Sequence, residues 1–188
     1  MPSKLSEVWE AAARYIQTLN YLTYRKIDAE KVRHVQLRIG IVLGAVEGKG
    51  LPLATDRGIL PIIRAPFCLG MGGYLGKGDQ WFPWIHIDDV VAIYMKALTD
   101  PSMQGIYNCV APKIVTNKEL TDEFAKRLRR PILWHIPAWL IKLVVGEERS
   151  GILLRGQYVF PERTLDSGFQ YKYPSIDVAL DNLVKIYF

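Results

Sequence analysis

The sequence has 188 residues, of which 49% are hydrophobic and 23% are charged, and its formal net charge is +5. This composition is that of a globular chain with a substantial core, and it excludes disorder and low complexity. The positive charges gather only near the end of one predicted helix, at Lys126–Arg130. No nucleic-acid-binding motif accompanies them, so we expect no nucleic-acid partner.

The sequence gives no membrane, metal or secretion signal. The apolar run Trp139–Val145 is too short for a membrane span and contains Lys142, so we expect no membrane partner. Neither the two cysteines nor the three histidines have the spacing of metal ligands, which predicts no metal site. No signal-peptide core follows Met1, and reduced cysteines fit a reducing compartment. We therefore predict a cytoplasmic location, with the mitochondrion as the alternative.

In chain order, the periodicity of apolar residues predicts helices and strands in alternation. The predicted strands are 35–44, 84–87, 105–110 and 132–136, and the predicted helices are 8–16, 51–66, 88–98, 116–129, 138–145 and 176–187. Asp88 or Asp89 is expected to cap the helix at 88–98, and Thr116 with Glu119 forms a predicted capping box. This alternation predicts the α/β class with a parallel sheet, followed by a more irregular C-terminal part.

Three glycines, Gly70, Gly73 and Gly76, match the spacing GxxGxxG. A dinucleotide fingerprint works only between a strand and a helix, whose N–H groups face the pyrophosphate. The residues after Gly76 cannot continue a helix, so we predict a surface loop there. The chain contains no GxGxxG, and no tyrosine is followed by a lysine four residues later.

Several segments together resemble a known family. They are Val8–Ala13, Leu37–Gly44, Gly70–Gly78 with Trp81–Asp89, Asn108–Asn117, Pro137–Gly146 and Leu154–Pro174. In this order they resemble the C-terminal half of an atypical extended short-chain dehydrogenase/reductase, of the NAD(P)-dependent "epimerase family protein" branch. The resemblance implies an incomplete Rossmann-like parallel sheet over residues 1–130 and a small, mostly helical substrate lobe over residues 131–188.

The family's glycine-rich nucleotide loop and its catalytic serine and tyrosine are not among these 188 residues. We therefore name no catalytic residue, and we expect the substrate-side half of an epimerase or reductase that acts on a small polar or nucleotide-linked molecule. The full-length family uses NAD or NADP, and we expect this chain alone to bind neither. The alternative is a non-catalytic interaction or regulatory domain. An exposed sheet edge also predicts self-association.

Arg38 is the candidate cofactor-binding residue. It lies in an otherwise apolar strand, where an unpaired guanidinium is costly. The resemblance implies that it contacts a phosphate of the cofactor or substrate. A salt bridge to Asp88 is the alternative.

Four further residues are candidates for binding the substrate: Trp81, Trp84, His86 and Arg155. Indole rings stack on flat ligands, and a guanidinium suits an anionic group. The alternatives are core packing for the tryptophans, a structural role for the histidine and a surface position for the arginine. Asn108 and Gln157 are additional ligand candidates.

Overall fold

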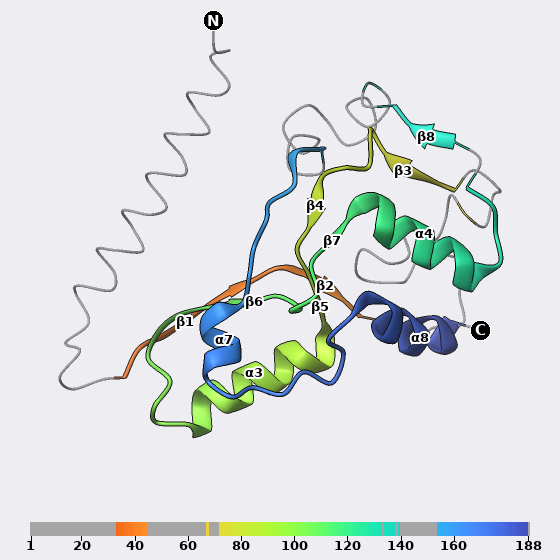
Figure 1. Cartoon of the computed structure of the whole chain (residues 1–188). Helices are drawn as coiled ribbons and strands as arrows, with labels where there is room; N and C mark the ends of the chain where they lie inside the picture. The colour runs from red at the N-terminus through yellow and green to blue at the C-terminus, as the bar shows by residue number, and fades with distance from the viewer. Residues whose placement is uncertain are drawn as a thin grey trace, which may run out of the picture.

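The computed structural model describes residues 33–44, 67, 72–132, 134–137, 139 and 154–187 (Figure 1). Its strands are β1 (Val35–Ile39), β2 (Ile41–Leu43), β3 (Gly73–Leu75), β4 (Trp81–Phe82), β5 (Trp84–His86), β6 (Gly105–Cys109), β7 (Val115–Thr116) and β8 (Trp134–Ile136). Its helices are α3 (Ile87–Thr99), α4 (Asn117–Leu128), α7 (Glu162–Asp166) and α8 (Ile176–Tyr187).

The predicted strand at 35–44 is present and is interrupted once, at Gly40. β1 pairs in parallel with β6, and β2 pairs in parallel with β5. A Cβ atom on Gly40 would lie 2.5 Å from the carbonyl oxygen of Pro83 and 2.7 Å from Cγ1 of Val110. Only glycine therefore lets the neighbouring backbone approach so closely. Helix α3 connects β5 to β6, as a parallel arrangement requires.

Helix α3 forms where it was predicted, but its cap differs from the prediction. The N-cap is His86, whose ring Nδ1 accepts a hydrogen bond from the backbone N–H of Asp88 at 3.1 Å. The prediction of Asp88 or Asp89 as the cap is wrong, because the chain is already helical from Ile87. The Asp89 carboxylate instead accepts hydrogen bonds from backbone N–H groups of the C-terminal segment, at Lys172 (2.8 Å) and Tyr173 (3.0 Å).

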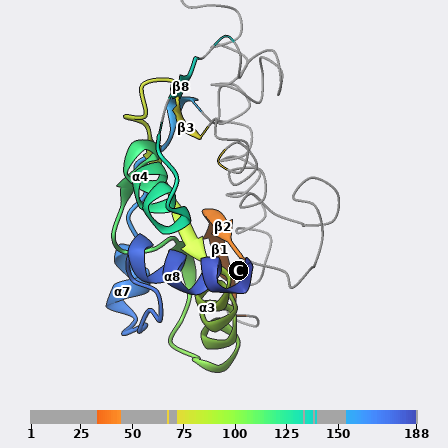
Figure 2. The ribbon, with the colours of Figure 1, turned by 90° about the vertical axis from the view of Figure 1, so that its right-hand side faces the viewer.

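Helices α4 and α8 lie side by side (Figures 1 and 2). The predicted capping box opens α4: Thr116 Oγ1 accepts from the N–H of Glu119, whose carboxylate accepts from the N–H of Thr116. Four residues of the predicted apolar stripe of α8 are buried, Ile176, Ala179, Leu180 and Leu183. They share one core with residues of α4 and of the strands, among them Leu43, Trp84 and Phe124.

The glycine-rich segment contains a strand that the sequence did not predict. β3 pairs in parallel with β8, and the N–H of Leu75 donates to Oδ1 of Asn117 at 2.8 Å. The prediction of a loop at this point is therefore wrong for Gly73–Leu75. Gly76 and Gly78 follow with φ of 58° and 76°, in the region that favours glycine.

The outer edge of β6 is covered by side chains of α7. The guanidinium of Arg163 donates to the carbonyl oxygens of Gln104 (2.8 Å) and Ile106 (3.0 Å), and Thr164 Oγ1 donates to the carbonyl oxygen of Asn108 (2.8 Å). The carbonyls of Ile106 and Asn108 lie two residues apart on β6, and that of Gln104 immediately precedes the strand, whereas the carbonyl of Cys109 accepts from Gly40 on the β1 side. Within the described residues, β1 pairs with β6 alone, so its own outer edge has no strand beside it.

The parallel strand pairs with intervening helices confirm the predicted α/β, Rossmann-like class. The predicted helices at 8–16, 51–66 and 138–145 lie outside the described residues. The division into 1–130 and 131–188 stays a prediction. In the described part of the chain, no helix has the length and apolar character needed to cross a membrane.

Candidate functional site

A cavity of about 380 Å³ lies where β1 and β6 reach their carboxyl ends. Its polar lining comes from Arg38, Asn108 and Gln157, its aromatic lining from Tyr158 and Phe160, and the rest from Ile39, Gly40, Pro83, Val110 and Val159. Open α/β sheets bind their ligands at the carboxyl ends of their strands. Its lining combines polar side chains with aromatic and aliphatic ones, and convergent polar groups in a hollow are what fix the orientation of a small molecule.

Arg38 borders this cavity and is exposed. It stands in register with Asn108 on β6. Its neighbour Leu37 packs on the opposite side, against the core beneath α3, because side chains alternate along a strand. The expectation of a buried guanidinium is thus corrected. The alternative, a salt bridge to Asp88, is also not found, since Asp88 pairs with Lys172 at 2.9 Å.

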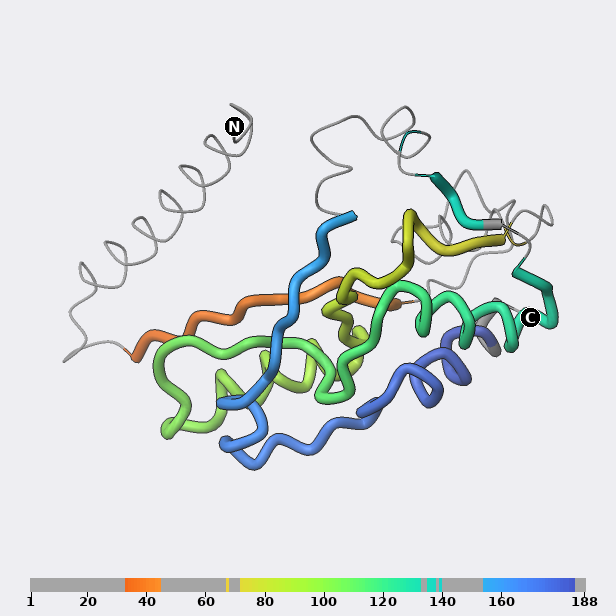
Figure 3. The backbone as a smooth tube through the Cα atoms, turned by 45° about the horizontal axis from the view of Figure 1, so that its top comes forward, coloured from red at the N-terminus to blue at the C-terminus, as the bar shows by residue number. Residues whose placement is uncertain are grey.

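One wall of the cavity is the segment Gln157–Phe160, which crosses beside β1 and β6 (Figure 3). Its position is fixed by Asn108, whose side-chain amide donates to the carbonyl oxygen of Phe160 at 3.1 Å. Just before the wall, Gly156 passes so close to β4 that a Cβ atom would lie 2.4 Å from the carbonyl oxygen of Trp81. Its φ of 59° also favours glycine.

Trp81 lies beside this wall. Its ring packs edge-to-face on that of Tyr158, with the centroids 5.1 Å apart, and both side chains are exposed. Two of the predicted site residues therefore lie beside the segment Gln157–Phe160: Arg38 lines the same cavity, and Trp81 packs on Tyr158. Arg155 is exposed close by in sequence but is not part of the lining.

Trp84 and His86 lie elsewhere, in the interior. Trp84 is 1% exposed, and its indole N–H donates to the carbonyl oxygen of Lys113 at 3.2 Å. His86 is 2% exposed and stacks on Tyr173, with the ring centroids 3.7 Å apart. Burial lowers the pKa of His86, against the opposing effect of the nearby Asp88 carboxylate. Substrate contact by these two residues stays a prediction.

Asp88 and Lys172 form a second polar cluster, at the start of α3. Hydrogen bonding from Lys172 lowers the pKa of the Asp88 carboxyl. With the Asp89 contacts already described, this cluster attaches the C-terminal segment to α3. Among the described residues, no three histidine, cysteine, aspartate or glutamate side chains come together as metal ligands.

Sequence reasoning missed the aromatic wall residues Tyr158 and Phe160. They are among the exposed large hydrophobic residues, at 63% and 45%. The available signal was the run Gln157–Phe160, in which two aromatic residues flank a β-branched one just after a glycine. Nothing local in that run indicates that it faces Arg38, because the contacts that place it come from β6.

Parallel strand pairs, a helical crossover and a cavity at the strands' carboxyl ends define an α/β fold of the Rossmann type. Comparison with known proteins gives the same class. The model of the NAD dependent epimerase/dehydratase family matches residues 24–109, and that of a domain of unknown function, DUF1731, matches residues 136–183.

Relatives are found in animals and plants. The human epimerase family protein SDR39U1 is 36% identical over 182 residues, which are 97% of this chain and 55% of the human protein. The chloroplastic SDR39U1 homolog of Arabidopsis thaliana is 38% identical over 149 residues, 79% of this chain and 40% of the homolog. This chain spans about half the length of the curated relatives that it matches.

Solved structures of epimerases also match the fold of this chain. The crystal structure of human SDR39U1 (isoform 2) with NADPH matches with a TM-score of 0.73 and 38% identity, over 82% of this chain and 49% of that one. A nucleoside-diphosphate sugar epimerase from Corynebacterium glutamicum matches with a TM-score of 0.55 and 25% identity, over 82% of this chain and 26% of that one. The chain therefore belongs to the NAD-dependent epimerase/dehydratase family, on the branch of epimerase family protein SDR39U1. This confirms the resemblance drawn from the sequence.

Proposed function

We propose that this chain supplies the substrate-side part of an NAD(P)-dependent epimerase or reductase site. The substrate is a small polar molecule with an anionic group, such as a nucleotide-linked compound. The observation that carries the proposal is an exposed arginine, Arg38, facing a cavity of about 380 Å³ at the carboxyl ends of parallel strands. Among the described residues, no acid group is paired with this guanidinium.

The lining has a chemistry that suits such a ligand. The Arg38 guanidinium offers a fork of N–H donors that matches phosphate or carboxylate oxygens. Gln157 adds an amide, while Asn108 is already engaged through its N–H₂ with the wall. Tyr158 and Phe160 offer exposed aromatic surface beside these polar groups. Together these side chains could orient a molecule that carries a charged group at one end and a flat or apolar group at the other.

The solved human relative contains NADPH. The described residues of this chain fit one anionic group of such a molecule, at Arg38. They include no strand, glycine-rich loop and helix in succession to receive a pyrophosphate, and the sequence has no GxGxxG. When bound, the coenzyme would supply the hydride chemistry. The residues of this chain would orient the substrate.

Titration of the purified 188-residue chain with NADPH tests whether this chain contributes the substrate side of the site without binding the coenzyme. We expect no saturable rise in nicotinamide fluorescence, because one arginine offers only a single anchor for a molecule with several phosphates. A separately folded SDR39U1 relative that carries the glycine-rich loop is the positive control. Tight, saturable NADPH binding by the 188-residue chain itself would contradict the proposal.

A second candidate function is a non-catalytic interaction domain. The observation that favours it is the exposed apolar surface of α3 together with the uncovered edge of β1 in the described structure. Self-association through the edge of β1 belongs to this candidate. The two functions differ in their readout, because the first predicts binding of small anions and the second predicts association of chains.

A further inference from the structure

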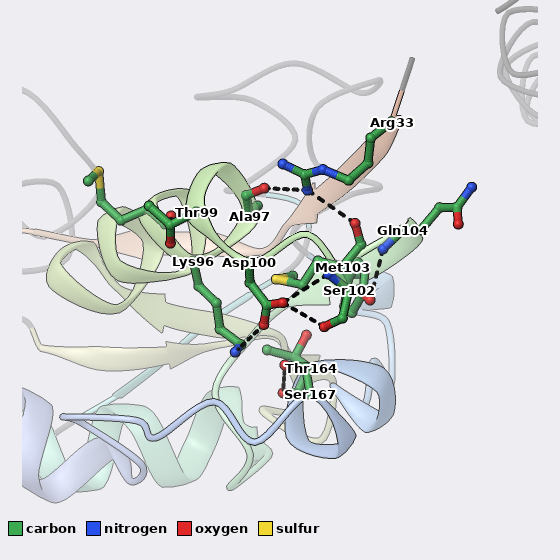
Figure 4. Close-up of polar contacts among 12 residues, drawn as sticks. Arg33, Lys96, Ala97, Thr99, Asp100, Ser102, Met103, Gln104, Thr164 and Ser167 are labelled. Carbon is green, nitrogen blue, oxygen red and sulfur yellow. Dashed lines mark hydrogen bonds and ion pairs between the residues drawn. The ribbon is translucent and has the colours of Figure 1, made fainter. Parts of the chain in front are cut away.

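Asn108 of β6 is held at two points by the C-terminal segment. Its backbone carbonyl oxygen accepts from Thr164 Oγ1 at 2.8 Å, and its side-chain amide donates to the carbonyl oxygen of Phe160 at 3.1 Å. Thr164 is 1% exposed, and its own carbonyl oxygen accepts from the hydroxyl of Ser167 at 2.7 Å (Figure 4). These contacts give the Asn108 side chain a fixed position in the fold.

The contact with Phe160 determines which end of the Asn108 amide is left for a ligand. A backbone carbonyl oxygen can only accept, so the atom that contacts it is the amide nitrogen, and Oδ1 is the other end. Among the described residues no donor contacts Oδ1, and this oxygen is accessible rather than buried. Asn108 lines the cavity, so its oxygen offers the cavity a fixed hydrogen-bond acceptor.

Arg38 and Asn108 are register partners in the parallel pair of β1 and β6. Register partners present their side chains on the same face of a sheet, and both residues line the same cavity. The Arg38 guanidinium has only donors, whereas Oδ1 of Asn108 has only acceptor lone pairs. The pair therefore suits a ligand that carries an anionic group and, close to it, a hydroxyl that donates.

Gln157 is the other side-chain amide of the lining, and it differs from Asn108 in one respect. It is exposed, and among the described residues no contact holds either end of its amide. A free amide turns to present its oxygen or its nitrogen, so it pairs with donors and acceptors alike. Discrimination between the two kinds of ligand group is therefore expected from Asn108 and not from Gln157.

We propose that Asn108 determines specificity: its Oδ1 accepts a hydrogen bond from a hydroxyl of the substrate while Arg38 binds the anionic group. This inference rests on the proposed function, since it concerns the same cavity. It narrows the substrate class to hydroxylated anions, such as phosphate esters of sugars. A ligand without the hydroxyl leaves Oδ1 without its partner, which should weaken binding by about three- to tenfold.

Calorimetric titration of the purified 188-residue chain tests the proposal with two probes, uridine monophosphate and its dideoxy analogue, which lacks both ribose hydroxyls. The probes share the phosphate and the base, so the ratio of their affinities isolates the hydroxyls. We expect wild type to bind uridine monophosphate about three- to tenfold more tightly than the analogue. Asn108→Ala should bring the two affinities within about twofold of each other, whereas the matched control Gln157→Ala should keep the wild-type ratio.

A second control separates contact with the hydroxyl from an effect on the cavity wall. Thr164→Val removes the hydroxyl that holds the backbone of Asn108, and it should weaken both probes by a similar factor while the ratio stays that of wild type. A purely structural role of Asn108 would give the same result for Asn108→Ala, with an unchanged ratio, and that result would overturn the proposal.

The wild-type chain alone also decides, without any variant. Equal binding of the two nucleotides, together with a preference for uridine monophosphate over uridine, would overturn the role of Asn108 and leave the anion site at Arg38 standing. Absence of any preference for the monophosphate over uridine would contradict the proposed function itself, and the role of Asn108 with it.

Discussion

His86 shows how the environment of one side chain determines its chemistry. Its ring is buried, caps α3 through Nδ1 and stacks on Tyr173. Nδ1 can accept the hydrogen bond from Asp88 only while it carries no proton. Burial lowers the pKa of His86 below 6.5, although the carboxylates of Asp88 and Asp89 raise it and Lys172 adds to the lowering.

This lowered pKa predicts a specific pH dependence of stability. The unfolded chain binds the proton first as the pH falls below 6.5, so the free energy of unfolding falls in that range. The His86→Asn variant keeps a capping acceptor but does not titrate. Urea unfolding between about pH 5 and 8, the range in which histidines titrate, should show wild type losing stability relative to His86→Asn toward acid. Parallel curves for the two proteins would show that His86 does not titrate differently on folding.

At the scale of elements, local signals predicted helices α3, α4 and α8, whereas α7 was not predicted. The apolar period of α8 and the Thr116–Glu119 pair of α4 act over a few residues, so they are visible in sequence. β3 was missed because its partner β8 lies some sixty residues later and the stretch itself is rich in glycine. The cap of α3 was misplaced because Asp89 is held by Lys172 and Tyr173, from more than eighty residues away.

The capping box gives a prediction at the same scale. Thr116→Ala removes the acceptor for the N–H of Glu119 and should lower the free energy of unfolding by about 1 kcal/mol. Thr99→Ala is the matched control, because Thr99 is an exposed threonine at the C-terminal end of helix α3, where it caps no N–H group. This substitution should change the free energy of unfolding by less than about 0.5 kcal/mol. Equal effects of the two substitutions in urea unfolding would argue against the cap.

For the whole molecule, the class of fold was predictable and the shape of the site only in part. Arg38 was singled out from its place in an apolar strand, and its ligand role came from the family resemblance; the structure places it exposed beside the cavity rather than buried. The wall opposite it depends on hydrogen bonds between β6 and the C-terminal segment, one from Asn108 of β6 to Phe160 and others from Arg163 and Thr164 to carbonyls of β6. Such contacts join residues more than fifty positions apart, and no local pattern in the sequence records them.

The central claim is that Arg38 receives the anionic group of a substrate. Calorimetric titration with uridine monophosphate and with uridine isolates the phosphate. We expect the wild-type chain to prefer the monophosphate by about tenfold or more, and Arg38→Gln to lose most of that preference. Arg130→Gln, which changes an exposed arginine outside the cavity, should retain it. The claim is contradicted if wild type does not distinguish the two compounds, or if Arg38→Gln still prefers the monophosphate as wild type does.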